Sequence, residues 1–197
     1  MDLELTDRVV IATGASSGIG QATVGVLLEE GAKVVACARD QTRLSASVDQ
    51  LDPSRVPAVP GDVTSADEMT GLVATTLDRF DRLDGVACLA GRAASGHALD
   101  LTAKQWAIEI DDKISGVMNL VRAACPELAA TAGRIVTLTA PTARDPAPPM
   151  AAVSAGRASI ASLTRSLALD LADEGIAGNS VSVGLIDTPL QRERHRP

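Results

Sequence analysis

A glycine-rich turn, Thr13-Gly14-Ala15-Ser16-Ser17-Gly18-Ile19-Gly20, separates an apolar run at residues 9–13 from a helical pattern that continues to about residue 30. The glycines allow a tight turn and a close approach of the backbone to a ligand. The start of the following helix offers backbone N–H groups that no helical carbonyl can accept. Such a turn between a strand and a helix is typical of a site for a dinucleotide pyrophosphate.

Outside this turn, apolar runs alternate with helical patterns along the chain. After the first strand, strands are expected at residues 33–38, 56–59, 85–90, 134–139 and 178–183. Helices are predicted at residues 41–51, from the Ser65 cap, from the Thr102 cap, along a separate apolar stripe at 114–128, and at 151–172. This alternation favours an α/β fold with a doubly wound parallel sheet, strand order 3-2-1-4-5-6, and a ligand crevice between strands 1 and 4.

The composition is that of one domain with an aliphatic core. Hydrophobic residues make up 46% of the 197 residues, yet the chain has no Tyr, one Phe and one Trp. We expect a single domain at residues 1–190 and a charged, disordered tail at 191–197. The net charge of −7 argues against a nucleic-acid partner, because phosphate backbones require a basic surface.

Cysteine spacing and hydropathy exclude other classes. Cys37, Cys88 and Cys125 show no metal-binding or disulfide pattern, so no metal is expected and they are interpreted as small buried apolar residues. No apolar run has the length of a membrane span, and the acidic N-terminus is unlike a signal peptide. We therefore expect a cytoplasmic protein with no membrane partner.

The chain resembles the short-chain dehydrogenase/reductase family over about residues 5–190. Its glycine turn has the TGxxxGxG spacing of that family. The resemblance implies a Rossmann-type fold that binds a nicotinamide dinucleotide. It assigns cofactor binding to residues of the glycine turn, the adenine side, the fourth-strand turn and the nicotinamide side: Gly14, Ser16, Ser17, Gly18, Ile19 and Gly20; Asp62 and Val63; Ala90 and Gly91; Ile186 and Thr188.

The end of the second strand selects between the two dinucleotides. An acidic residue there would bind the adenosine ribose and repel a 2′-phosphate, but this chain has Ala38 followed by Arg39. An arginine can pair bidentately with a phosphate. The sequence therefore predicts NADP(H) in preference to NAD(H).

The resemblance also locates the positions of the family's reaction chemistry. There the family has a proton-transferring Tyr, a Lys that holds the nicotinamide ribose, a Ser that orients the carbonyl and an Asn that supports a water. Alignment of the flanking segments places Val153, Arg157, Ala140 and Lys113 at these four positions. Val and Ala side chains neither donate nor accept hydrogen bonds, although Arg157 can still hold a ribose. Because positioned acid–base catalysis contributes roughly 10²–10⁴-fold, standard carbonyl reduction is not expected.

Three functions remain compatible with the sequence. The leading hypothesis is an NADP(H)-binding pseudoenzyme that serves as a regulatory or partner subunit. The first alternative is an atypical NADP(H)-dependent oxidoreductase whose proton comes from Lys113, from His97 or from an acidic group of the substrate itself. The second is a non-redox enzyme, such as an isomerase or cyclase, that takes a small molecule in the same crevice.

The two alanine-rich helices at 114–128 and 151–172 suggest an oligomer. In the family the corresponding helices pair across a two-fold axis, which implies a homodimer here, or pairing with another subunit of the same family. After Asp187-Thr188-Pro189-Leu190 the family continues into a substrate-covering segment, a last strand and a helix. These C-terminal elements are absent from this sequence.

Overall fold

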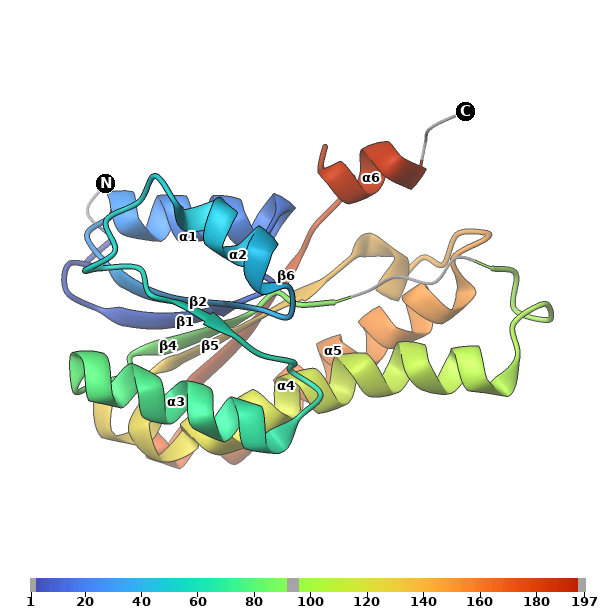
Figure 1. Ribbon diagram of the computed structural model, residues 1–197. Helices are drawn as coiled ribbons and strands as arrows, with labels where there is room; N and C mark the ends of the chain where they lie inside the picture. Colours follow the sequence, from blue (N-terminus) through green and yellow to red (C-terminus); the bar gives the residue numbers. More distant parts are fainter. Residues whose placement is uncertain (1–2, 92–95, 195–197) are drawn as a thin grey trace.

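A six-stranded parallel sheet forms the centre of the protein (Figure 1). The computed structural model describes residues 3–91 and 96–194. The strand order β3-β2-β1-β4-β5-β6 is the predicted one. The strands are β1 (Val9–Thr13), β2 (Lys33–Ala38), β3 (Ala58–Pro60), β4 (Gly85–Cys88), β5 (Arg134–Thr139) and β6 (Ala177–Ser182).

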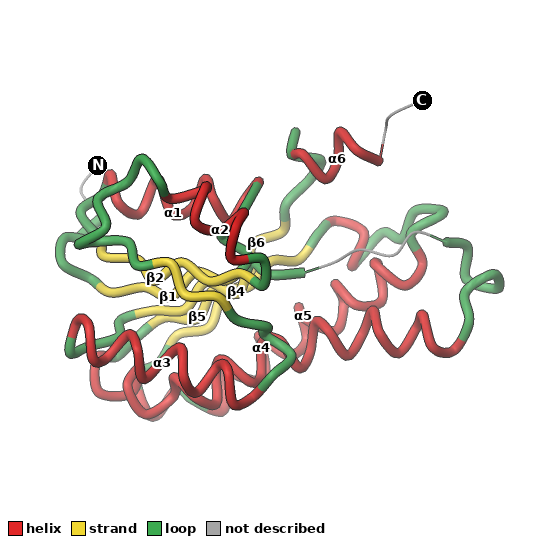
Figure 2. The backbone as a smooth tube through the Cα atoms, in the orientation of Figure 1, coloured by secondary structure: helices red, strands yellow, loops and turns green. Residues whose placement is uncertain are grey.

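Helices cover both faces of the sheet (Figure 2). One face carries α1 (Gly18–Glu29) and α2 (Gln41–Val48), and the other carries α3 (Ala66–Phe80), α4 (Ala103–Thr131) and α5 (Ala151–Asp170). Two short 3-10 helices, η1 (Pro141–Ala143) and η2 (Ala172–Glu174), lie on either side of α5 in the sequence, and α6 (Pro189–Arg194) lies beyond β6. This is the doubly wound α/β arrangement expected from the sequence.

Two aliphatic clusters, one on each face, hold the layers together. Ile11, Val86 and Leu120 belong to the cluster that joins the sheet to α3, α4 and α5. Val24 and Leu44 belong to the cluster beneath α1 and α2. Successive residues of the inner strands point to opposite faces and are buried on both, which explains why their sequences are continuously apolar.

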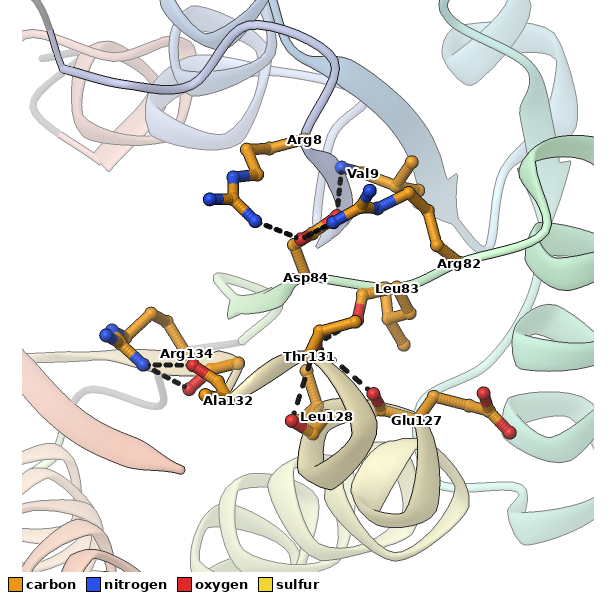
Figure 3. A network of polar contacts seen from close by, with 11 residues as sticks. Arg8, Val9, Arg82, Leu83, Asp84, Glu127, Leu128, Thr131, Ala132 and Arg134 are labelled. Carbon is orange, nitrogen blue, oxygen red and sulfur yellow. Dashed lines mark hydrogen bonds and ion pairs between the residues drawn. The ribbon is translucent and has the colours of Figure 1, made fainter. Parts of the chain in front are cut away.

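Asp84 joins three strands at the edge opposite their carboxyl ends (Figure 3). Its carboxylate accepts hydrogen bonds from the Val9 N–H at 2.9 Å, from Arg8 at 2.9 Å and from Arg82 at 2.8 and 2.6 Å. The Asp84 N–H donates to the Val9 carbonyl, and the Asp84 carbonyl accepts from the Arg134 N–H. One side chain and its peptide group therefore fix the relative positions of β1, β4 and β5.

Several sequence-based boundaries were wrong. The two helices expected between Thr102 and residue 128 are one helix, α4, which begins with a capping box between Thr102 and Gln105. Its buried stripe includes Leu120 and Ala124, whereas Met118 is only half-buried. Glu109 and Lys113 are buried within this stripe, so the apolar pattern is interrupted in the sequence although the helix is continuous.

Residues 191–194, the first part of the expected tail, are helical. They form the last part of α6, and the Arg192 guanidinium bonds both oxygens of Asp187 at 2.7 and 2.8 Å. Residues 195–197 lie outside the described part of the chain. Cys37 and Cys88 are buried as predicted, whereas Cys125 is half-buried. Burial raises the pKa of Cys37 and of Cys88 to about 12, so neither thiol is ionised at neutral pH.

Candidate functional site

A cleft of about 500 Å³ lies at the carboxyl ends of the strands, where the winding reverses between β1 and β4. This is the position at which doubly wound sheets bind ligands, and the volume falls in the usual range for such sites. The residues around it come from the glycine turn, the β2–α2 segment, the β3–α3 segment, the β4 and β5 ends, α5 and the start of α6: Gly14, Ser16, Ser17, Gly18, Ile19, Gly20, Ala38, Arg39, Asp40, Arg43, Gly61, Val63, Leu89, Ala90, Gly91, Leu138, Arg157, Thr188 and Pro189.

The glycine turn is shaped by close backbone contacts. Gly14 has a positive φ of 70°, and a side chain there would lie 2.9 Å from the backbone of Ala90. A side chain at Gly20 would overlap the carbonyl oxygen of Gly14 and lie 2.7 Å from its carbonyl carbon. These positions accept only glycine without a backbone movement, so the sequence pattern reflects the geometry of the turn.

Hydrogen bonds hold the turn against the neighbouring strands. The Thr13 hydroxyl accepts from the N–H groups of Leu89 and Ala90 at 3.1 and 3.2 Å. The Ala15 N–H donates to the Cys37 carbonyl at 3.1 Å. The floor of the cleft is therefore fixed to β1, β2 and β4 before any ligand arrives.

The start of α1 fits the pyrophosphate of a dinucleotide. Ser17 occupies the N-cap position in an extended conformation, and its side chain makes no capping hydrogen bond. The N–H groups of the first helical turn therefore remain available to an anion that enters the cleft. With no side chain at Gly18, which lines the cleft, the ligand can approach this backbone closely.

Two arginines and one aspartate lie at the β2 end of the cleft. Arg39, Asp40 and Arg43 all line it. The Asp40 carboxylate accepts a hydrogen bond from the Arg43 N–H at 2.9 Å and so caps α2. Both guanidinium groups are on exposed residues, and this end of the cleft has one more positive than negative charge. The sequence analysis identified Arg39 but missed Arg43, whose signal was its place in the first turn of a helix capped by Asp40.

The other end of the cleft contains Arg157. Its guanidinium donates to the Leu138 carbonyl at 2.7 Å, and Gly91 faces it from the end of β4. The Thr139 hydroxyl donates to the Arg157 carbonyl, so this threonine points at α5 and not into the cleft. Val153 lies one helical turn before Arg157 and is buried.

Lys113 does not line the cleft. Its side chain is buried between α4 and α5, where the ammonium pairs with the Glu109 carboxylate one turn earlier. Burial lowers the pKa of Lys113 and the Arg157 charge lowers it further, whereas Glu109 raises it. The sequence analysis missed Glu109, although a glutamate four residues before a lysine on a helix is the spacing of an ion pair.

The remaining candidates lie at or beyond the rim. Asp62 and Ile186 are the two expected cofactor residues that do not line the cleft. The Asp62 carboxylate instead accepts hydrogen bonds from the Thr64 backbone and hydroxyl. His97 is exposed and is also outside the cleft lining. Among the described residues, no group of histidine, cysteine or acidic side chains has the arrangement of a metal site.

The comparisons with known proteins agree with this fold. A family model described as short chain dehydrogenase matches residues 8–197. This chain belongs to the short chain dehydrogenase family. An oxidoreductase from Staphylococcus aureus strain MW2 is 34% identical, and the alignment covers 94% of this chain and 81% of that protein.

Solved structures of other short chain dehydrogenases superpose closely. A short chain oxidoreductase from Pseudomonas aeruginosa PAO1, described as containing an atypical catalytic center, gives a TM-score of 0.91 at 33% identity over 96% of this chain and 74% of that one. Its NADPH-bound structure gives a TM-score of 0.90, and the match covers 96% of this chain and 77% of that one. A family member from Burkholderia phymatum in complex with NAD gives a TM-score of 0.90 at 26% identity. That match covers 99% of this chain and 72% of the other.

These neighbours support a nicotinamide dinucleotide as the cofactor of this fold. Both NADPH and NAD occur among them, so the choice between the two must come from this chain's own residues. Within the part of the chain that the structure describes, no helix is both long and apolar enough to cross a bilayer.

Proposed function

We propose that this chain is an NADP(H)-binding member of the short chain dehydrogenase family that does not carry out the family's tyrosine-dependent proton transfer. The observation that carries the proposal is a contrast between the cleft and the positions aligned with the family's reaction chemistry. The glycine turn and the open end of α1 fit a dinucleotide. Alignment with the family assigns Val153 and Ala140, whose side chains neither donate nor accept hydrogen bonds, to the positions of the proton donor and of the carbonyl-orienting hydroxyl. Binding without turnover is the function of a regulatory or partner subunit.

The preference for NADP(H) rests on the β2 end of the cleft. Arg39 and Arg43 can both reach a 2′-phosphate, and guanidinium–phosphate hydrogen bonds are among the strongest in proteins. The nearby Asp40 carboxylate is engaged by the Arg43 N–H, which restrains it from turning toward the phosphate.

Replacing both arginines tests this preference. Arg39→Met together with Arg43→Met should weaken NADPH binding at least tenfold, because hydrogen bonds to charged groups contribute about 1.5–3 kcal/mol. NADH, which lacks the 2′-phosphate, should bind the variant as it binds the original chain. Isothermal titration gives both affinities, and Arg165→Met, an exposed arginine on α5, is the charge-matched control. Equal affinity of the original chain for NADPH and NADH would contradict the assignment.

A second candidate is an NADP(H)-dependent oxidoreductase with a rerouted proton donor. The observation in its favour is the P. aeruginosa neighbour, whose description combines an oxidoreductase, bound NADPH and an atypical catalytic center. It requires NADPH oxidation by a carbonyl compound, with a rate that falls on Lys113→Ala or His97→Ala. The burial of Lys113 and the exposure of His97 outside the cleft lining favour the first proposal.

We also propose that two copies of the chain associate through α4 and α5. Ile108 on α4 and Leu169 on α5 are exposed apolar residues, 45% and 79% accessible. Light scattering coupled to size exclusion should give the mass of a dimer, and a monomer would exclude this arrangement.

A further inference from the structure

The two ends of the cleft differ in what they offer a dinucleotide. Arg39 and Arg43 are at the β2 end, whereas Gly91, Leu138 and Arg157 are at the β4–β5 end. The start of α1 lies between them and suits the pyrophosphate. With the 2′-phosphate at the β2 end, the nicotinamide ring must lie at the β4–β5 end, close to Arg157.

A buried ion pair lies behind Arg157. The Lys113 and Glu109 side chains are only 3% and 2% exposed. Lys113 passes over Gly156, the residue before Arg157, where a side chain would lie 2.8 Å from Lys113 Cδ and 3.2 Å from Cε. The absence of a side chain at Gly156 therefore brings the pair against the turn of α5 that carries Arg157; α4 and α5 run side by side in Figure 1.

The charges in this cluster sum to one positive charge. The Lys113–Glu109 pair is neutral as a unit, whichever partner carries the proton. Burial lowers the pKa of Arg157, and Glu109 opposes that shift. The guanidinium is charged because arginine is not deprotonated in proteins. Asp112 is partly exposed on the outer side of the pair and also acts on Lys113. Glu109 thus neutralises Lys113, so that Lys113 does not repel Arg157. The positive charge of Arg157, which faces the cleft, is not cancelled.

NADPH and NADP⁺ carry the same phosphates and differ in the nicotinamide ring, which is neutral when reduced and positively charged when oxidised. A nearby guanidinium disfavours the oxidised ring, and partly buried charges are weakly screened by salt. We propose that the Arg157–Lys113–Glu109 cluster makes the cleft selective for reduced NADPH over NADP⁺, so that occupancy reports the redox state of the dinucleotide pool. This inference rests on the proposed binding of NADP(H).

Titration of the purified chain with NADPH and with NADP⁺ at pH 7 and one ionic strength tests the selectivity. NADPH should bind about tenfold more tightly, since two unit charges roughly 10 Å apart at an effective dielectric of about 20 interact on that scale. Arg157→Met and Lys113→Met should each bring the two affinities close together. The first removes the positive charge, and the second leaves the Glu109 carboxylate to cancel it.

Two controls separate charge from structure. The double variant Glu109→Leu, Lys113→Met keeps the Arg157 charge with an apolar pair and should retain the preference; apolar replacement of a buried ion pair is often neutral for stability. Arg43→Met should weaken the binding of NADPH and of NADP⁺ by the same factor. If Lys113→Met fails to fold, Arg157→Met and the double variant still show whether the Arg157 charge causes the preference for NADPH over NADP⁺.

Equal affinities in the original chain, or an unchanged preference in folded Arg157→Met, would overturn the inference and leave the proposed function intact. Failure of both forms to bind would remove the proposed function itself.

Discussion

Gly20→Ala should abolish measurable NADPH binding, with an affinity loss of at least a hundredfold. The new methyl group would overlap the Gly14 carbonyl oxygen, so the glycine turn must open before the residue fits. That movement displaces the first N–H groups of α1, which the pyrophosphate needs. A hundredfold loss corresponds to about 2.7 kcal/mol. Forcing the extra atom into a packed backbone should also lower the free energy of unfolding by about 1–3 kcal/mol.

Gly25→Ala is the matched control on the same helix. A side chain at Gly25 would meet no heavy atom within 4 Å, and the residue lies inside α1. Alanine is favoured over glycine in a helix interior by about 1 kcal/mol, so this variant should gain stability and bind NADPH normally. Calorimetric titration and urea unfolding of both variants check the pair. Normal NADPH binding by Gly20→Ala would show that the turn does not form the cofactor site.

Asp84→Asn should be the most destabilising conservative substitution outside the cleft. The carboxylate is 9% exposed and bonds Arg8, the Val9 N–H and Arg82 (Figure 3). An asparagine keeps the shape but loses the charge and one acceptor. Hydrogen bonds to charged groups contribute about 1.5–3 kcal/mol each, so we expect a loss of about 3 kcal/mol in urea unfolding. Asp78→Asn, on the exposed face of α3, should change stability by less than about 0.5 kcal/mol.

The same residue predicts how stability depends on pH. Burial works to raise the pKa of Asp84, but hydrogen bonds from Arg82, the Val9 N–H and Arg8 outweigh it and hold the pKa below its ordinary value. A carboxyl with a depressed pKa stabilises the fold fully above its unfolded pKa, and this contribution disappears as pH falls through the folded value. The original chain should therefore lose stability below about pH 4 more steeply than Asp84→Asn. If the free energies of unfolding of the original chain and of Asp84→Asn fell in parallel with pH, Asp84 would not be the source of this pH dependence.

The fold was predictable because local patterns agreed with one another. The glycine turn, the continuous apolar strands and the helical stripes all indicated a doubly wound sheet, and the strand order followed from the rules of parallel crossovers. Boundaries failed where the pattern was interrupted. Glu109 and Lys113 interrupt the apolar stripe of α4, and in the fold they neutralise each other inside the α4–α5 packing.

The site was predictable only in part for a similar reason. Residues that shape the turn through their own backbone, such as Gly14 and Gly20, leave a spacing in the sequence that depends little on tertiary structure. The orientation of Lys113 toward Gly156 depends on how two helices pack, which no local pattern reports. Arg43 enters the cleft because Asp40 caps α2 in a particular place, so its contribution also required the structure.

We expect the chain to bind a dinucleotide in its cleft without the family's tyrosine-dependent proton transfer. The most direct test titrates the purified chain with NADPH and then adds a panel of ketones, aldehydes and quinones to the same samples, following absorbance of the reduced ring. The account predicts saturable NADPH binding with no oxidation above the rate without protein. Rapid carbonyl-dependent oxidation of NADPH, or no binding of NADPH at all, would contradict it.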